Sequence, residues 1–323
     1  MPRLSILVPL SGAVASFETT LASVLQNRPK DCDVLVAHPE SYDDPWSLSN
    51  EVQFLEAPED TPLLEMLDAC LPYVRGDVLH ILQGGLEATE GWTDAAVAAF
   101  RDPRVATVSP LVVNREQPTE AVSVGLSYSR GGQRLNVGAG LGLKAASSTS
   151  ILGPALRAGF YRTELLLQLG GWEAAIGEQW ADIDLALTLD AAGLTSRCVG
   201  DSVVIGHPEE PLARGIAAGR AAERVFWRHA VHRGWISSVL AHPFTVAADA
   251  LGALPSFAAA TQLLGRTLAL ADGARYAEYR KDLRRWLEQL DAANAATAAP
   301  APPGDAPAPP QIHPEPARRR HAA

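Results

Sequence analysis

The sequence is poor in cysteine, and its cysteines follow no metal-binding or disulfide pattern. Only Cys32, Cys70 and Cys198 are present, far apart and without a Cys-x-x-Cys pair. This spacing excludes a disulfide framework and a structural zinc site of the usual kind. A reducing compartment is the default for such a chain, and we expect the protein to be cytoplasmic.

Long apolar runs are also lacking. The apolar segment 6–8 near the N-terminus is too short for the core of a signal peptide. The nearest candidate for a membrane span, residues 235–264, is interrupted by His242, Asp249 and two prolines. We therefore expect a soluble protein, or one that contacts a membrane only peripherally, at its inner face.

Basic residues are in short supply as well. The chain has 27 lysines and arginines against 37 aspartates and glutamates, which gives a net charge of −10. A general nucleic-acid-binding protein needs a basic surface to displace counterions, so we expect no nucleic-acid partner. The glycine-rich loops G-x-G-x-x-G and Walker A are absent, which argues against the common dinucleotide and P-loop domains.

What the sequence does have suits one large α/β domain with an addition, since 47% of its 323 residues are hydrophobic. Over the first 110 residues, short apolar segments alternate with helical patterns. The expected strands are 4–8, 33–37, 52–55, 77–82 and 105–108, and the expected helices are 17–25, capped by Ser16, 63–73 and 95–100. This order favours a mostly parallel sheet flanked by helices. Ligands of such sheets bind beyond the carboxyl ends of the strands, so the loops after Val8, Ala37 and Leu82 are the expected site.

The remaining chain divides into three parts. Residues 115–155 are rich in Gly and Ser and predict a loop or hairpin. The expected elements after it are a helix over 164–169 capped by Thr163, a helix over 182–192 and a strand over 202–205. We place the main domain at 1–210, a helical extension at 211–291 and a disordered Ala/Pro-rich tail at 292–323. An apolar seam in the extension favours a helix packed on its own domain over a dimer zipper; it consists of Tyr276, Tyr279, Leu283, Trp286 and Leu290.

Three segments carry a resemblance to a known family. The first is Ser5-Ile6-Leu7-Val8-Pro9 with the helical Leu21-Ala22-Ser23-Val24-Leu25, and the second is Arg75-Gly76-Asp77 followed by an apolar strand. The third and most specific runs from Gly159-Phe160-Tyr161-Arg162 through Leu169-Gly170-Gly171-Trp172 and Asp182-Ile183-Asp184-Leu185 to Gly206-His207. In this order and spacing, the segments resemble family 2 glycosyltransferases of the GT-A fold over residues 3–210.

The resemblance implies a GT-A-like α/β fold followed by a C-terminal helical extension. It implies transfer of a sugar from a nucleotide-sugar donor to a saccharide or lipid-linked acceptor, in the synthesis of a cell-surface polysaccharide or glycolipid. On the positions that match the family's motifs, Asp182 is the general base on the acceptor hydroxyl. Gly171 and Trp172 are then expected to bind the acceptor. The donor-binding positions are Pro9, Ser11, His38, Gln83 and Gly85.

The sequence departs from the family where the family binds a divalent metal. Leu82-Gln83-Gly84-Gly85 stands in place of "L-D-x-D", so both carboxylates are missing and we assign no metal ligand. Mg²⁺ or Mn²⁺ is expected for the family, but it prefers anionic oxygen, and Glu87 is the only nearby carboxylate. After the second strand, His38 and Pro39 replace acidic residues that contact the nucleotide. The alternative function is therefore a catalytically inactive GT-A-like module that binds a saccharide, a nucleotide or a partner.

Several residues have a second interpretation. Asp182 and Asp184 are compatible with simple capping of a helix N-terminus, and Asp184 also with a buried hydrogen bond. Gly170 to Trp172 equally fit a helix C-cap followed by a core tryptophan, and His207 fits an ordinary residue at a strand end. The basic stripe formed by Arg220, Arg224, Arg228 and His232 suits contact with phosphates of a lipid surface or acceptor, or a solvated face paired with Glu209, Glu210 or Glu223.

Overall fold

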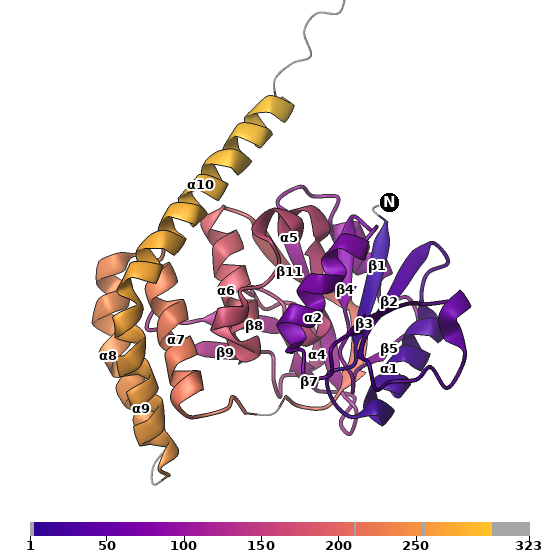
Figure 1. The fold of residues 1–323 in the computed structure, drawn as a ribbon, viewed down its shortest axis with the longest axis horizontal. Helices are drawn as coiled ribbons and strands as arrows, with labels where there is room; N and C mark the ends of the chain where they lie inside the picture. Colours follow the sequence, from indigo (N-terminus) through magenta and orange to yellow (C-terminus); the bar gives the residue numbers. More distant parts are fainter. Residues whose placement is uncertain (1–2, 210, 253–255, 299–323) are drawn as a thin grey trace, which may run out of the picture. The chain divides into compact units, whose positions relative to one another are not determined.

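The computed structural model describes residues 3–209, 211–252 and 256–298, with side chains up to residue 292. Residues 1–283 form one compact unit and residues 284–323 a second. The first unit contains the whole sheet and also helices of the expected extension. The predicted main domain and most of the predicted helical extension therefore belong to one compact unit. Figure 1 shows the order of the elements along the chain.

A nine-stranded sheet forms the centre of the first unit, in the order β3-β2-β1-β4-β10-β6-β11-β5, with β7 beside β6. The strands are β1 (Leu4–Pro9), β2 (Cys32–Pro39), β3 (Gln53–Ala57), β4 (Val78–Ile81), β5 (Glu87–Ala88), β6 (Val105–Asn114), β7 (Ala121–Ser123), β10 (Phe160–Arg162) and β11 (Thr195–Gly206). The long pairings, β1 with β2 and β6 with β11, are parallel, whereas the short strands β5, β7 and β10 pair antiparallel. The expected mostly parallel α/β sheet is confirmed.

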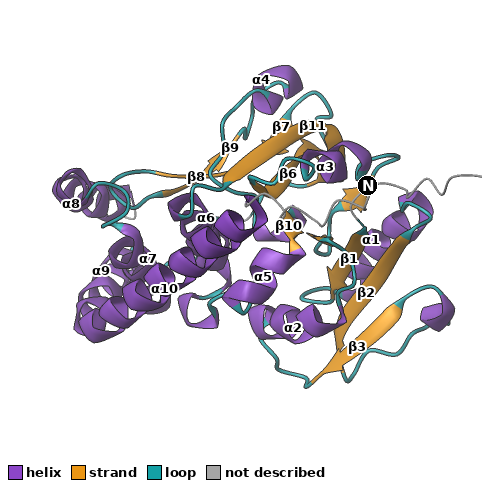
Figure 2. Cartoon of the chain, turned by 90° about the horizontal axis from the view of Figure 1, so that it is seen from above, coloured by secondary structure: helices purple, strands orange, loops and turns teal. Residues whose placement is uncertain are grey.

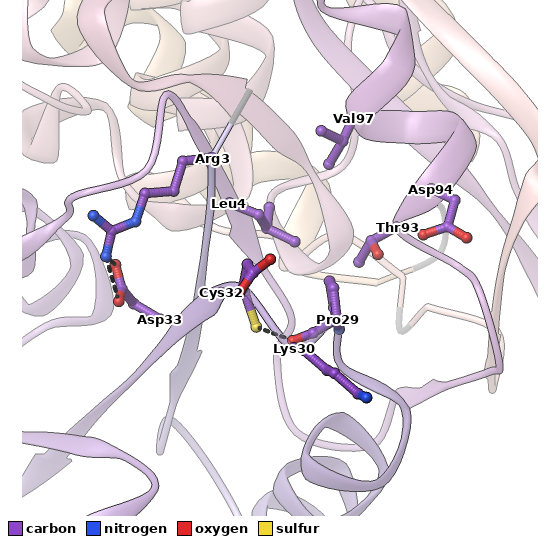
Figure 3. A pocket seen from close by; sticks show the side chains of 10 residues that line it. Arg3, Leu4, Pro29, Lys30, Cys32, Asp33, Thr93, Asp94 and Val97 are labelled. Atoms are coloured by element: carbon purple, nitrogen blue, oxygen red, sulfur yellow. Dashed lines mark hydrogen bonds and ion pairs between the residues drawn. The ribbon is translucent and has the colours of Figure 1, made fainter. Parts of the chain in front are cut away.

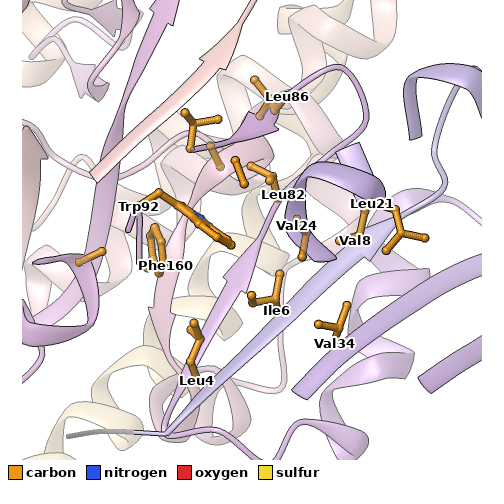
Figure 4. Close-up of a cluster of buried hydrophobic side chains, with 14 of the residues drawn as sticks. Leu4, Ile6, Val8, Leu21, Val24, Val34, Leu82, Leu86, Trp92 and Phe160 are labelled. Atoms are coloured by element: carbon orange, nitrogen blue, oxygen red, sulfur yellow. The ribbon is translucent and has the colours of Figure 1, made fainter. Parts of the chain in front are cut away.

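Helices cover both faces of this sheet. They are α1 (Val14–Asn27), α2 (Leu63–Cys70), α3 (Asp94–Ala99), α5 (Thr163–Leu169) and α6 (Glu178–Ala191). Figure 2 shows β1 and β2 between α1 and α2. In Figure 4, Ile6 and Val8 of β1 point toward Val24 of α1, in a core that also includes Leu82 and Trp92. Side chains alternate across a strand, so a strand covered on both sides is apolar at nearly every position. β1 fits this apart from Ser5, whose hydroxyl accepts the Gly76 amide.

One polar side chain, His80 of β4, is enclosed in this core. Its ring stacks on Phe160 with 3.6 Å between centroids, and its Nε2 accepts a hydrogen bond from Trp92 Nε1 at 3.1 Å. Its Nδ1 lies 3.1 Å from the Gly159 carbonyl oxygen, so Nδ1 carries the proton. Burial lowers the pKa of His80 to about 3, and the residue is therefore neutral at physiological pH.

The segment predicted as a loop or hairpin contains the hairpin β8 (Gly125–Tyr128) and β9 (Arg134–Val137), followed by α4 (Leu143–Ser147). Several element boundaries differ from expectation. α1 begins at Val14, before Ser16, and β6 continues well past Val108. Thr163 is the first residue of α5 rather than its cap, and its hydroxyl has no hydrogen-bond partner. α6 begins at Glu178, so Asp182 and Asp184 lie beyond its first turn and do not cap it.

The expected C-terminal helical region is present as α7 (Ile216–His229), α8 (Trp235–Gly252), α9 (Ala258–Ala269) and α10 (Gly273–Ala298). Two glycines bring α7 and α9 into backbone contact. A Cβ added at Gly219 would lie 2.1 Å from the Gln262 carbonyl oxygen, and one at Gly265 would lie 2.1 Å from that of Ile216. Residues 292–298, predicted as part of a disordered tail, belong to α10. The rest of that tail, 299–323, lies outside the described residues.

Candidate functional site

The carboxyl ends of β1, β2 and β4 meet at one edge of the sheet, as predicted for the donor site. Pro9 of β1 pairs in register with Ala37 of β2, and the Leu82 amide donates to the Leu7 carbonyl oxygen at 3.0 Å. The topology therefore brings Pro9, His38 and Gln83 to the same edge. The five predicted donor-binding residues differ in exposure. Ser11 is exposed, Gln83 and Gly85 are partly exposed, and Pro9 and His38 are buried.

His38 belongs to the packing below this edge. Its ring lies edge-on to Tyr42 and Phe54, with centroids 5.7 and 5.6 Å away, and only 7% of the residue is exposed. Its Nδ1 lies 3.0 Å from the Pro39 carbonyl oxygen. The Nε2 edge of the ring is therefore the part of His38 that can contact a nucleotide-sugar donor.

The loop after β4 leads directly onto the start of α1. The Gly85 amide donates to Thr20 Oγ1 at 3.1 Å, and a Cβ at Gly84 would lie 3.2 Å from the Phe17 amide nitrogen. Gly85 has a φ of +89°, a conformation that side-chain-bearing residues rarely adopt. The backbone of this loop is thus built for glycine at the position where the family has its second carboxylate.

These residues do not fit a divalent metal. Gln83 offers one neutral carbonyl oxygen and Gly85 no side chain at all. Glu87, the nearest carboxylate, is held in an ion pair by Arg115. Asp44 caps a turn by accepting the amides of Trp46 and Leu48. Within the part of the chain that the structure describes, no group of three or more His, Cys, Asp or Glu side chains is arranged to hold a metal ion.

Asp182 is buried in α6 and paired with Arg134 of β9. Its side chain is 4% exposed and that of Arg134 is 8% exposed. Arg134 donates to Asp182 through Nη2 at 2.8 Å and Nε at 3.3 Å, and the amides of Ile183 and Leu156 add bonds of 2.7 and 3.4 Å. Burial alone would lower the pKa of Arg134, but the Asp182 charge raises it above its ordinary value. Arg134 therefore stays charged and is held by the Asp182 side chain.

A second arginine, Arg157, lies between the loop after β4 and the end of β11. Its carbonyl oxygen accepts the Gln83 amide at 2.9 Å, and its Nη2 lies 3.4 Å from the His207 carbonyl oxygen. Burial lowers the pKa of Arg157, and the Glu209 charge offsets part of this effect. Glu209 itself has a buried oxygen, Oε1, without a hydrogen-bond partner. The His207 side chain is exposed beside this pair.

Asp184 faces the helical region and not this edge. Its Oδ1 lies 2.9 Å from His229 Nε2 and 3.2 Å from Arg228 Nε. Burial would raise the pKa of Asp184, but the Arg228 charge and the His229 hydrogen bond hold it below the usual range. The Arg228 guanidinium also lies over the Tyr279 ring, 3.7 Å from its centroid. Asp184 therefore anchors α7 and α10 to α6. It makes a buried hydrogen bond, one of its two predicted alternatives, and does not cap the helix.

The basic stripe of α7 is engaged within the protein. Arg220 and Arg224 both pair with Asp272, at 3.0 and 2.7 Å, and Arg228 pairs with Asp184 and Glu173. The predicted pairing with Glu223 is wrong, because Glu223 accepts from Trp227 and faces His242 and Arg266 in a buried cluster. The stripe therefore offers little free charge for lipid phosphates.

Gly171 and Trp172 lie at the end of α5. Gly170 ends the helix with a φ of +76°, as the C-cap interpretation predicts. Trp172 is 3% exposed and edge-on to Tyr161, and its amide donates to Asp68 Oδ1 at 3.0 Å. These contacts favour a core tryptophan, and an acceptor-binding role for its ring remains a prediction. Burial raises the pKa of Asp68 to about 6.

A pocket of about 700 Å³ lies at the opposite edge of the sheet, where β1 and β2 begin. Figure 3 shows Arg3 paired with Asp33 in its wall, at 2.8 Å, and Lys30 and Asp94 also line the pocket. Ligands of parallel sheets bind at the carboxyl edge, so the size of this pocket does not make it the candidate site.

The comparisons with known proteins concern the fold. No protein-family model matches the chain, and no curated protein matches it. A crystal structure of GalNAc-T7 with UDP, GalNAc and Mn²⁺ superposes with a TM-score of 0.58 at 15% identity, over 94% of this chain and 59% of that one. The fold is GT-A-like. The chain spans about three-fifths of the length of GalNAc-T7.

A second similar structure is the mannosyltransferase PcManGT from Pyrobaculum calidifontis, in complex with GDP-Man and Mn²⁺. It has a TM-score of 0.49 at 20% identity, over 92% of this chain and 88% of that one.

Sequence reasoning missed Arg134 and Arg157, and it named Glu209 only as a possible partner of the α7 stripe. Arg134 lies in the weakly patterned segment after residue 115, and nothing local indicates that its partner is in α6. Arg157 lies two residues before the motif that begins at Gly159, and the quoted motif does not include it.

Proposed function

We propose that this protein transfers a sugar from a nucleotide-sugar donor to a saccharide or lipid-linked acceptor. The observation that carries the proposal is the GT-A-like fold. In this proposal the donor lies at the loop after β4 and the end of β11, and Asp182 acts on the acceptor. The finer proposal is an inverting hexosyltransferase of family 2 that builds a cell-surface polysaccharide or glycolipid in the cytoplasm.

In this proposal Asp182 takes the proton of the acceptor hydroxyl as its oxygen attacks the anomeric carbon. The nucleoside diphosphate leaves from the opposite face of the sugar. Both Asp182 oxygens are engaged in the structure, so the acceptor must displace a hydrogen bond. The two long bonds, from Arg134 Nε at 3.3 Å and Leu156 N at 3.4 Å, are the ones that a hydroxyl would replace at least cost.

A donor panel tests the proposal. We expect calorimetry to detect binding of a UDP- or GDP-sugar, and we expect Asp182→Asn to abolish release of the nucleotide while donor binding persists. The matched control is Asp201→Asn, an exposed carboxylate on β11. Absence of binding at millimolar donor, with and without Mn²⁺, would refute the proposal.

The second candidate function is a catalytically inactive module. It is favoured by one observation, the loss of both metal-binding carboxylates in a loop whose Gly85 backbone disfavours their return. Such a module binds a saccharide or a nucleotide but does not turn it over. Donor turnover that Asp182→Asn eliminates would rule it out.

We also propose peripheral contact with an anionic membrane through α8 and α9, in place of the α7 stripe. Their exposed apolar side chains are Trp235, Ile236, Leu240, Phe244, Leu251, Phe257, Leu263, Leu264 and Leu268. The two helices carry one acidic and one basic residue, Asp249 and Arg266, which pair with each other. Exposed Arg130 and Arg214 contact opposite ends of α8, where they can reach lipid phosphates. None of the described helices is both long and apolar enough to span a bilayer.

Vesicle sedimentation tests this contact. We expect binding to vesicles that contain phosphatidylglycerol and much less to pure phosphatidylcholine. Phe244→Asp should weaken binding, whereas Leu167→Asp, on the exposed side of α5, should not. Equal binding of both variants would contradict the proposal.

A further inference from the structure

A partly buried cation, Arg157, lies at the edge of the sheet where the residues present do not fit a metal ion. The Arg157 guanidinium lies where β11 ends, close enough to Gly206 that a Cβ there would be 3.2 Å from Nη2. On its other side, the Arg157 backbone is tied to Gln83, the position of the family's first metal-binding carboxylate. Arg157 therefore joins the two strand ends, β4 and β11, that face the donor in the proposed function.

The charge of Arg157 is partly buried, yet few groups of the protein compensate it. Among the described residues it makes no ion pair, and its one hydrogen bond is the long contact of 3.4 Å to the His207 carbonyl oxygen. Glu209 is close enough to influence its pKa, yet forms no hydrogen bond with it. Two other arginines of this edge, Arg134 and Arg115, are paired with Asp182 and Glu87. Arg157 is thus the guanidinium that retains donors for an anion.

We infer that Arg157 binds the diphosphate of a nucleoside diphosphate donor in place of a divalent metal. This inference rests on the proposed function. A guanidinium presents paired N–H groups that match two phosphate oxygens, and its positive charge opposes the charge of the diphosphate. Gly85 in the loop after β4 leaves its side of the site open, since a Cβ at Gly85 would meet no atom within 4 Å.

Calorimetry in EDTA tests the inference, with UDP and GDP as probes and uridine and guanosine as their phosphate-free counterparts. We expect the wild-type protein to bind one of the two diphosphates in EDTA and to gain little from Mn²⁺. Arg157→Gln should weaken that binding by about 10- to 100-fold, the range for a charged hydrogen-bonding group. Nucleoside binding should be unchanged, because the guanidinium acts only on the phosphates.

Two variants separate this role from a structural one. Arg104→Gln removes a charge from an arginine whose side chain is 75% exposed at the opposite edge, and it should leave affinity unchanged. Arg157→Lys keeps the charge but loses the paired geometry, so its affinity should lie between those of the wild type and Arg157→Gln. If Arg157→Gln does not fold, Arg157→Lys is the test. The inference then requires that Arg157→Lys lose affinity for the diphosphate and keep its affinity for the nucleoside.

The outcomes that overturn the inference differ from those that overturn the proposed function. Diphosphate binding that requires Mn²⁺, or that survives in Arg157→Gln, refutes the role of Arg157 and leaves the glycosyltransferase proposal standing. If the wild-type protein binds no diphosphate or nucleotide sugar under either condition, both fall.

Discussion

The ion pair between Asp182 and Arg134 makes a sharp prediction about stability. Both side chains are almost wholly buried, at 4% and 8% exposed. Removing one partner of a buried pair leaves the other charge unpaired, which costs about 3–5 kcal/mol. Asparagine at 182 keeps one oxygen to accept from Arg134, so we expect Asp182→Asn to lower the free energy of unfolding by roughly 3 kcal/mol, the low end of that range.

Arg134→Met removes the other half of the pair. Asp182 then keeps only two backbone donors, Ile183 N at 2.7 Å and Leu156 N at 3.4 Å. The double variant Asp182→Asn/Arg134→Met leaves no buried charge at this site. The double variant should therefore lose less free energy of unfolding than the sum of the two single variants. The difference should be roughly 1–3 kcal/mol, as for residues in direct contact.

Urea unfolding followed by circular dichroism measures all four proteins, and turnover is measured well below the unfolding transition. If Asp182 is the base, Asp182→Asn loses turnover while Arg134→Met, which leaves the carboxylate in place, keeps a measurable part of it. The argument from burial would be refuted if Asp182→Asn lowered the free energy of unfolding by less than about 1 kcal/mol. It would also be refuted if the losses of the two single variants simply added in the double variant.

Three further predictions follow from the structure. Burial holds the pKa of His80 at about 3 against 6.5 in a free side chain, so the unfolded chain binds more protons between these values; the free energy of unfolding should fall as pH drops through this window, and His80→Asn should reduce that slope in urea titrations. Gly171→Ala should be far more destabilising than Gly170→Ala, because a Cβ at Gly171 would lie 2.0 Å from Asp68 Oδ1 whereas one at Gly170 meets open space; equal melting temperatures would contradict this. Restoring both family carboxylates with Gln83→Asp and Gly85→Asp should not create tight Mn²⁺ binding, since the φ of +89° at Gly85 strains any side chain, and a micromolar affinity in calorimetry would show otherwise.

The sheet was predictable where burial leaves a strong local pattern. β1, β2 and β4 are mostly apolar on both faces, and these short runs of apolar residues identify them without further information. β10 was missed because it has only three residues and pairs antiparallel with its neighbours. Its position depends on β4 and β6, which lie far away in the sequence.

The start of α6 was misplaced for a related reason. Its first residues, Glu178 and Gln179, follow Gly177, and no side-chain cap marks the boundary. The residues from Trp180 to Leu189 are all buried, so the helix lacks a polar face whose period would identify it.

The charged residues were the least predictable part of the site. The spacing of Arg220, Arg224 and Arg228 correctly indicated one helix face. Their partners are Asp184 in α6, Asp272 in the turn before α10, and Glu173. Local spacing shows which side chains share a face, whereas the fold decides which charges face them. For this reason the pair of Asp182 with Arg134, which joins α6 to a distant hairpin, could not be read from the sequence.

The same reasoning connects Arg157 to stability. A partly buried guanidinium without a carboxylate partner costs free energy in the unliganded protein, and a bound anion recovers that cost. A ligand that binds only the folded state raises the melting temperature by mass action. UDP or GDP in EDTA should therefore stabilise the wild-type protein more than Arg157→Gln, while uridine and guanosine should act equally on both. An equal shift with the diphosphate in both proteins would mean that the charge of Arg157 is compensated within the chain and that the phosphates bind elsewhere.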